Sequence, residues 1–230
     1  MSAQRDYFPE RAVSIPITGA ALHGDLTTPH NAKGIVLFAH GSGSSRHSPR
    51  NRFVARVLQL SGFATLLMDL LTADEEAIDA RTAALRFDIP LLARRLVEVT
   101  WWIVDQPQTA NLRIGYFGAS TGAAAALVAA AELPDLVAAI VSRGGRPDLA
   151  GDALRQVVAP TLLIVGERDR TVLELNRKAF NELPGEKKLE IVRGATHLFE
   201  EPGALEAAAQ LAQQWFLRYL TPKVDESVAA

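Results

Sequence analysis

Residues 111–133 read NLRIGYFGASTGAAAALVAAAEL, and the interpretation of the whole chain starts from this stretch. Its first part, Asn111–Phe117, is short and rich in residues that favour strands, with Gly115 as the weakest position. Its last part is rich in alanine and predicts a helix that packs closely on a sheet. A tight turn with a single serine, Ser120, connects the two. The stretch therefore predicts a strand, a turn and a helix.

The turn Gly118–Gly122 fits the pattern G-x-S-x-G, in which a serine is held in a strained backbone between a strand and a helix. The positions two residues before and after Ser120 must be small, and both are glycine. The N-terminus of the following helix would direct unpaired N–H groups toward an anion formed at the serine. A plain surface serine is the alternative, because so short a pattern also arises by chance.

Composition places the chain among ordinary globular proteins. Its 230 residues are 48% hydrophobic and 22% charged, which suits a single domain over 1–230 with a frayed tail at 221–230. The net charge of −2 argues against a nucleic-acid partner. No cysteine is present, the N-terminus lacks the apolar core of a signal peptide, and no apolar run could span a bilayer. These features predict a cytoplasmic protein without a membrane partner, and they leave the oligomeric state open.

Strands and helices alternate after residue 34, which predicts an α/β fold: a mostly parallel sheet with helices on both faces. An antiparallel hairpin, turning at Thr18-Gly19, is predicted to precede it. Residues 71–89 show only a weak amphipathic pattern. The predicted strands are 12–17, 21–26, 34–39, 63–70, 111–117, 137–141, 161–165 and 188–192, and the predicted helices outside the quoted stretch are 49–60, 89–104, 172–183 and 204–220.

A histidine and an acid follow the serine in chain order. His197 comes after the last predicted strand and Asp169 after the one before it, so both would lie with Ser120 at the carboxyl edge of the sheet. Glu167 and Asp148 compete for the role of the acid. Asp169 is favoured because two residues of turn carry it past the end of its strand.

With these residues in place, the chain resembles the dienelactone hydrolase-like serine hydrolases of the α/β-hydrolase superfamily, which lack a separate cap domain. The resemblance covers nearly the whole chain and rests on four motifs in the expected order: HGSGSS (40–45), GASTG (118–122), GERD (166–169) and GATH (194–197). Dienelactone hydrolases proper carry a cysteine in the turn where this chain has Ser120. This difference favours ordinary ester chemistry over dienelactone as the substrate.

The expected roles are those of a catalytic triad. Ser120 would attack a carbonyl carbon, His197 would carry the proton, and Asp169 would orient the imidazole. Backbone N–H groups of Thr121 and Ser42 are expected to form the oxyanion hole. The chain is thus predicted to be a serine hydrolase of small-molecule carboxylic esters or lactones, without a cofactor. A thioesterase, an acyltransferase or a non-catalytic ligand binder with the same fold remain alternatives.

Two further features concern ligands. The segment HGSGSS could be read as a dinucleotide loop, but Arg46 stands at the third glycine position and no P-loop lysine follows. No pair of histidines has the spacing of metal ligands. Arg143 follows a strand at the predicted site, and Arg46 lies in the loop after His40. Both are candidates to bind an acidic group of the substrate, although arginine is more often simply exposed.

Overall fold

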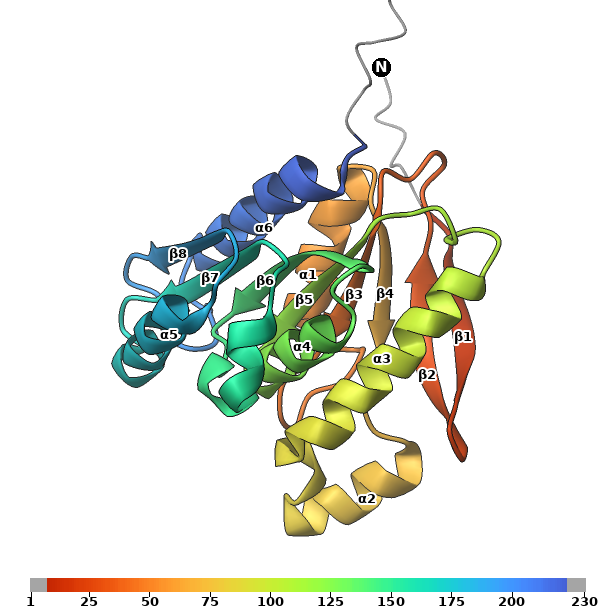
Figure 1. Cartoon of the computed structure of the whole chain (residues 1–230), viewed down its shortest axis with the longest axis horizontal. Helices are drawn as coiled ribbons and strands as arrows, with labels where there is room; N and C mark the ends of the chain where they lie inside the picture. Colours follow the sequence, from red (N-terminus) through yellow and green to blue (C-terminus); the bar gives the residue numbers. More distant parts are fainter. Residues whose placement is uncertain (1–7, 223–230) are drawn as a thin grey trace, which may run out of the picture.

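A computed structural model describes residues 8–222, which form one eight-stranded sheet covered by helices (Figure 1). The strand order is β1-β2-β4-β3-β5-β6-β7-β8, and all neighbours from β4 to β8 are parallel. The strands are β1 (Glu10–Ile17), β2 (Ala20–Thr27), β3 (Ile35–Ala39), β4 (Ala64–Met68), β5 (Ile114–Ala119), β6 (Val137–Arg143), β7 (Thr161–Gly166) and β8 (Lys187–Val192). This confirms the predicted sheet, including the antiparallel hairpin at the N-terminal end.

The central strands are apolar throughout because helices cover both faces of the sheet. Every residue of β3, β4, β5 and β7 is buried, which matches their unbroken hydrophobic sequences. The N-terminal hairpin β1–β2 turns at Gly19, whose φ of 77° favours glycine, and β2 then pairs antiparallel with β4. The hairpin thereby extends the sheet beyond its parallel part.

The helices form two layers (Figure 1). α1 (Pro49–Leu60) and α6 (Ala204–Leu220) pack on one face, around Phe38, Phe117 and Phe216. α3 (Ile89–Asp105), α4 (Thr121–Glu132) and α5 (Arg170–Glu182) lie on the other face, together with the 3-10 segment η2 (Pro147–Gln156). Small side chains let α4 lie close to the sheet: seven of its alanines and glycines are among its buried residues, namely Gly122, Ala123, Ala124, Ala125, Ala126, Ala129 and Ala130.

One region departs from the simple alternation of strand and helix. The weak pattern over 71–89 folds as α2 (Ala73–Thr82) and a short turn, η1 (Leu85–Phe87). A capping box between Thr72 and Glu75 starts α2, yet Asp79 is its only buried residue. A helix with so small a buried face gives no strong periodic signal, which explains why its boundaries could not be predicted. No separate cap domain is present within residues 8–222.

Several boundaries differ from the sequence prediction. β5 begins at Ile114 rather than Asn111, because the Leu112 N–H bonds to the Thr109 carbonyl and keeps the chain in a turn. The 3-10 segment η2 was not predicted. Of the tail predicted from 221, only residues 221–222 lie within the described part of the chain. Among the described helices, none is both long enough and apolar enough to cross a membrane.

Candidate active site

Ser120 sits at the sharp turn between β5 and α4, where its φ of 49° and ψ of −122° are unusual for a residue with a side chain. The two glycines of the motif make this turn sterically possible. A Cβ on Gly118 would lie 2.4 Å from the Cα of Ala123, and one on Gly122 would lie 2.2 Å from the carbonyl oxygen of Ala39. The backbone strain is therefore held in place by tight packing on both sides of the serine.

This packing makes Gly122→Ala a test of the turn. We expect the substitution to lower the free energy of unfolding by about 2–3 kcal/mol, because the added methyl group meets backbone that cannot easily move. Urea unfolding of both forms measures the effect. Gly203→Ala is the control, because its Cβ would meet nothing within 4 Å and only its φ of 80° opposes the change. A smaller loss in Gly122→Ala than in Gly203→Ala would contradict this description of the turn.

His197 and Asp169 form a hydrogen-bonded pair at the same edge of the sheet. The His197 Nδ1 lies 2.6 Å from the Asp169 Oδ2. Asp169 immediately precedes α5 after β7, and His197 lies in the loop after β8, as their sequence positions predicted. A carboxylate can only accept, so Nδ1 carries the proton in the neutral imidazole and Nε2 is left as the basic nitrogen.

The two competing acids are occupied elsewhere. Both oxygens of Asp148 accept from the guanidinium of Arg146, at 2.9 Å and 2.7 Å. Glu167 accepts the backbone N–H of Gly194 at 2.8 Å, which helps to shape the loop that carries the histidine. Of the three candidates, Asp169 is the acid that the fold brings to His197.

The end of β6 connects the histidine loop to the serine. The Ser120 N–H points at the Arg143 carbonyl, at 3.4 Å. The next residue, Gly144, has a φ of 52°, and a Cβ there would lie 3.1 Å from the His197 carbonyl oxygen and 3.6 Å from its ring. Ser120 and His197 are therefore packed against neighbouring residues of the same strand end.

The loop after β3 closes the other side of Ser120. A Cβ on Gly41 would lie only 2.9 Å from the Cβ of Ser120, so the loop touches the serine. The hydroxyl groups of Ser42 and Thr121 are hydrogen-bonded at 3.0 Å. The structure thus brings together the two residues that the sequence suggested as oxyanion-hole donors.

His40 supports this loop, a role that the sequence did not reveal. Its Nδ1–H donates to the Gly41 carbonyl and its Nε2 accepts the Leu70 N–H, both at 3.0 Å, so the ring connects the ends of β3 and β4. Burial lowers the pKa of His40, although the Gly41 hydrogen bond and the charge of Asp69 oppose the shift. The ring is held neutral, since protonation of Nε2 would break its bond to Leu70.

A dependence of stability on pH follows from this histidine. In the unfolded chain the imidazole takes up a proton below its ordinary pKa of 6.5, whereas the folded protein resists protonation. The free energy of unfolding should therefore decrease as the pH falls below about 6.5. Urea unfolding at a series of pH values measures the slope. We expect a smaller slope in His40→Gln and an unchanged slope in the control His30→Gln, at an exposed site. Equal slopes in all three proteins would exclude this role of His40.

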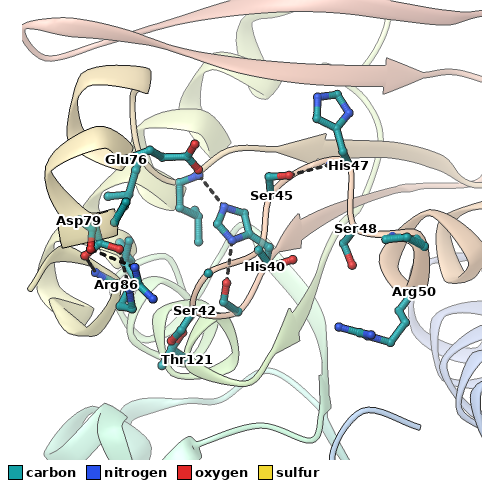
Figure 2. A pocket seen from close by; sticks show the side chains of 18 residues that line it. His40, Ser42, Ser45, His47, Ser48, Arg50, Glu76, Asp79, Arg86 and Thr121 are labelled. Carbon is teal, nitrogen blue, oxygen red and sulfur yellow. Dashed lines mark hydrogen bonds and ion pairs between the residues drawn. The ribbon is translucent and has the colours of Figure 1, made fainter. Parts of the chain in front are cut away.

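A cavity of about 570 Å³ opens beside the serine turn (Figure 2). Its walls come from the loop after β3, the first turn of α1 and the side of α2. Figure 2 shows Arg50 extending from α1 toward the side of the cavity where Ser42 and Thr121 lie. Most of the lining residues are polar, and Leu70, Leu71 and Leu92 are among the apolar ones. The polar residues are His40, Ser42, Ser44, Ser45, His47, Ser48, Arg50, Glu76, Asp79, Arg86 and Thr121.

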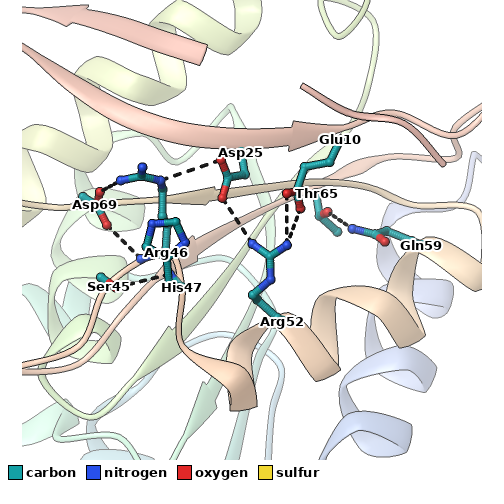
Figure 3. Close-up of polar contacts among 9 residues, drawn as sticks. All are labelled: Glu10, Asp25, Ser45, Arg46, His47, Arg52, Gln59, Thr65 and Asp69. Carbon is teal, nitrogen blue, oxygen red and sulfur yellow. Dashed lines mark hydrogen bonds and ion pairs between the residues drawn. The ribbon is translucent and has the colours of Figure 1, made fainter. Parts of the chain in front are cut away.

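The two arginines suggested as ligand-binding residues differ in their surroundings. Arg46 forms ion pairs with Asp69 and, at 3.7 Å, with Asp25 (Figure 3). Its positive charge is neutralised by these carboxylates, so it offers no unpaired charge to a substrate. Arg143 is only 6% exposed and lies against the first turn of α1, where it bonds to Asn51. The sequence could not distinguish the neutralised Arg46 from the buried Arg143, because the partners of both lie on elements that are distant in sequence.

Comparisons with known proteins place the chain in a family. It matches the dienelactone hydrolase family over residues 21–223. A dienelactone hydrolase from Anabaena variabilis, of known crystal structure, is 61% identical, with a TM-score of 0.91 over 93% of this chain and 99% of that one. Est1E from Butyrivibrio proteoclasticus shares the fold, with a TM-score of 0.76 over 90% and 98% of the two chains, at 17% identity.

Curated relatives from two strains of Mycobacterium tuberculosis, each named a putative phosphoribosyl transferase, are 64% identical over 197 residues. The matched segment covers 86% of this chain but 44% of those proteins. This chain therefore spans less than half the length of these relatives.

Proposed function

Because the chain belongs to the dienelactone hydrolase family, we propose that it is a serine hydrolase that cleaves carboxylic esters or lactones. The observation that carries this proposal is the hydrogen-bonded pair of His197 and Asp169, which lies at the same sheet edge as the strained Ser120. This is the arrangement that nucleophilic catalysis by a serine requires: a nucleophile, a base and a group that orients the base.

In the proposed reaction, the Ser120 hydroxyl oxygen attacks the acyl carbon while His197 Nε2 takes its proton. Asp169 stabilises the imidazolium through the 2.6 Å hydrogen bond. The backbone N–H groups of Thr121 and Ser42 stabilise the negative oxygen of the tetrahedral intermediate. The intermediate then expels the alcohol, which receives the proton from His197. A water molecule hydrolyses the acyl-enzyme by the same steps.

The hydroxyl pair of Ser42 and Thr121 supports the position of the oxyanion hole. Their contact fixes the loop after β3 against the start of α4, where the helix N-terminus favours negative charge. The neutral ring of His40 stabilises the same loop through its hydrogen bonds to the Gly41 carbonyl and the Leu70 N–H. Donors that are fixed before the reaction need no rearrangement when charge develops.

The name of the mycobacterial relatives points to a different reaction, which we do not assign to this chain. The matched segment is less than half of those proteins. This chain itself matches the dienelactone hydrolase family over residues 21–223. Thioester hydrolysis and acyl transfer would use the same three residues, and the choice between them depends on the leaving group and the acceptor.

Labelling with a fluorophosphonate probe tests the proposal. We expect wild type and Ser45→Ala to gain one covalent adduct by mass spectrometry, and Ser120→Ala to gain none, because the probe reacts with activated serines. Ser45 is the matched control because it also lines the cavity. A panel of p-nitrophenyl esters, with and without an added alcohol acceptor, then separates hydrolysis from acyl transfer. A wild-type protein that is not labelled and cleaves no ester would be a ligand binder.

A further inference from the structure

Two arginine side chains from distant parts of the chain lie near the first turn of α1, one in it and one bonded to it. Arg50 is in the first turn of α1, and Arg143 ends β6. Arg143 donates from Nη2 to the Asn51 Oδ1 at 3.4 Å, a long hydrogen bond, and its guanidinium carbon lies 5.6 Å from the ring centre of Phe199. The Nε atoms of both arginines are buried and have no partner among the described residues. Each of the two guanidinium groups thus has one buried donor without a partner near the first turn of α1.

The local charge balance is positive. Burial and, to a smaller extent, the nearby charge of Arg50 lower the pKa of Arg143 to about 10, so Arg143 remains charged at neutral pH. Within residues 8–222 no carboxylate forms an ion pair with Arg143, while Arg50 pairs at 3.2 Å with Glu200, whose side chain is 65% exposed. A solvated surface pair of this kind is weak. A buried cation with no anionic partner is costly, and a bound anion would remove that cost.

The position of this cluster connects it to the proposed chemistry. Arg50 lines the cavity that also contains Ser42 and Thr121, and it extends toward them in Figure 2. Arg143 bonds to Asn51, the next residue of the same helix turn, and its electrostatic effect is felt together with that of Arg50. An anionic group held by Arg50 would therefore occupy the cavity that opens beside Ser120.

The charges on the α1 side of the cavity favour a dianion over a single carboxylate. Arg50 and Arg143 carry two positive charges there against the one negative charge of the exposed Glu200. The N-terminus of the 12-residue α1 adds a partial positive charge, and its first turn contains no acidic residue. The acidic lining residues Glu76 and Asp79 belong to α2, where Arg86 pairs with Asp79. A phosphate monoester carries a charge of about −1.5 to −2 at pH 7 and offers three acceptor oxygens, which suits guanidinium groups at a helix N-terminus. Arg46, in contrast, is already neutralised by aspartates.

We propose that the substrate of this hydrolase carries a phosphoryl group, which Arg50 binds with Arg143 as a second positive charge nearby. Cleavage of an ester bond in this substrate rests on the proposed function, whereas binding of its anionic group by Arg50 does not. Arg50 contacts the phosphoryl group directly. Arg143 is a positioning residue that acts through its charge and its contact with the first turn of α1.

The first experiment measures binding without catalysis. Inorganic phosphate is titrated into the Ser120→Ala protein by calorimetry, with Arg50→Gln, Arg143→Gln and Arg155→Gln each added to it. We expect Arg50→Gln to raise the Kd about tenfold or more, Arg143→Gln to raise it less, and high salt to weaken all binding. Arg155 is the control, because it is exposed and pairs with Asp152 and Glu182 instead. Phosphate binding that is absent, or equal in all variants, would overturn the anion site.

The second experiment compares three p-nitrophenyl esters with similar acyl chains: the pentanoate, the succinate monoester and the 3-phosphonopropanoate. We expect kcat/KM to be about tenfold or more higher for the phosphonate than for the pentanoate, with the succinate between them. Arg50→Gln should remove this preference through KM, and Arg143→Lys should retain most of it because the charge remains. An equal or better rate with the succinate would overturn the phosphoryl assignment.

The outcomes also separate a structural role of Arg143 and a failure of the proposed function. If Arg143 only holds Phe199, then Arg143→Gln will lower kcat/KM equally for all three esters and leave phosphate binding unchanged. If the protein binds phosphate through Arg50 but cleaves no ester, the anion site stands and the hydrolase proposal fails. If esters are cleaved with no preference for a charged group, the hydrolase proposal stands and the anion site fails.

Discussion

Ser120→Ala is expected to lower kcat on the best p-nitrophenyl ester by about three to six orders of magnitude. The substitution would remove the proposed nucleophile, while the proposed oxyanion hole and the cavity would stay in place and supply the residual rate. The fold should be retained, because the turn is held by Gly118 and Gly122 and the serine hydroxyl is not part of that packing. Steady-state kinetics and thermal unfolding together measure the two effects.

A matched variant makes this result specific to the turn. Ser45→Ala also removes a serine hydroxyl group from the lining of the same cavity. The Ser45 hydroxyl accepts the backbone N–H of His47 and has no proposed role in the reaction, so we expect the kcat of this variant to stay close to that of wild type. A Ser120→Ala protein that keeps more than about a tenth of the wild-type kcat would show that another group attacks the substrate. The triad would then have to be abandoned.

Asp169→Asn is expected to lower kcat by about 10⁴, the size of effect that the corresponding change has in other Ser-His-Asp triads. An amide in place of the carboxylate can donate to His197 Nδ1, which then loses its proton to Nε2 and leaves no basic nitrogen for the serine. His197 Nδ1 lies 2.6 Å from the Asp169 Oδ2, so an amide at position 169 would act on this nitrogen directly. The same steady-state assay measures the loss.

Asp148→Asn is the control for the acid. Asp148 is paired to Arg146 rather than to His197, so its substitution should change kcat only slightly. The assignment of the acid would be refuted by the reverse pattern, a fully active Asp169→Asn and an inactive Asp148→Asn. Glu167→Gln provides a further comparison, because Glu167 bonds to backbone in the histidine loop.

Much of the fold could be predicted from local patterns. α1 was predicted at its observed boundaries, and the buried strands were recognised because continuous apolar runs require helices on both faces of a sheet. The alternation of strands and helices predicted that the loops with Ser120, Asp169 and His197 lie at the same edge of the sheet. Where a turn competed with a strand, as at Leu112, the pattern alone placed the boundary wrongly.

The surroundings of charged residues could not be predicted. Arg46 was suggested as a ligand-binding residue, but its partners Asp25 and Asp69 lie on or beside strands that are distant in sequence. Arg50 gave no signal, because only the folded chain brings it to Arg143. Sequence shows which residues follow a strand, whereas the pairing of their charges depends on which strands are neighbours.

The segment containing α2 and η1 has a consequence for how the sequence of this fold can change. It contributes Glu76, Asp79, Ala80 and Arg86 to the cavity wall. Nevertheless α2 buries only Asp79. The Arg86–Asp79 ion pair joins η1 to α2 within the segment, and the Arg95–Glu75 ion pair attaches the segment to α3. Substitutions on its remaining surface can therefore alter which molecules enter the cavity at little cost in folding stability. Divergence among relatives in the compounds they accept is expected to begin there, while the serine turn tolerates almost no change.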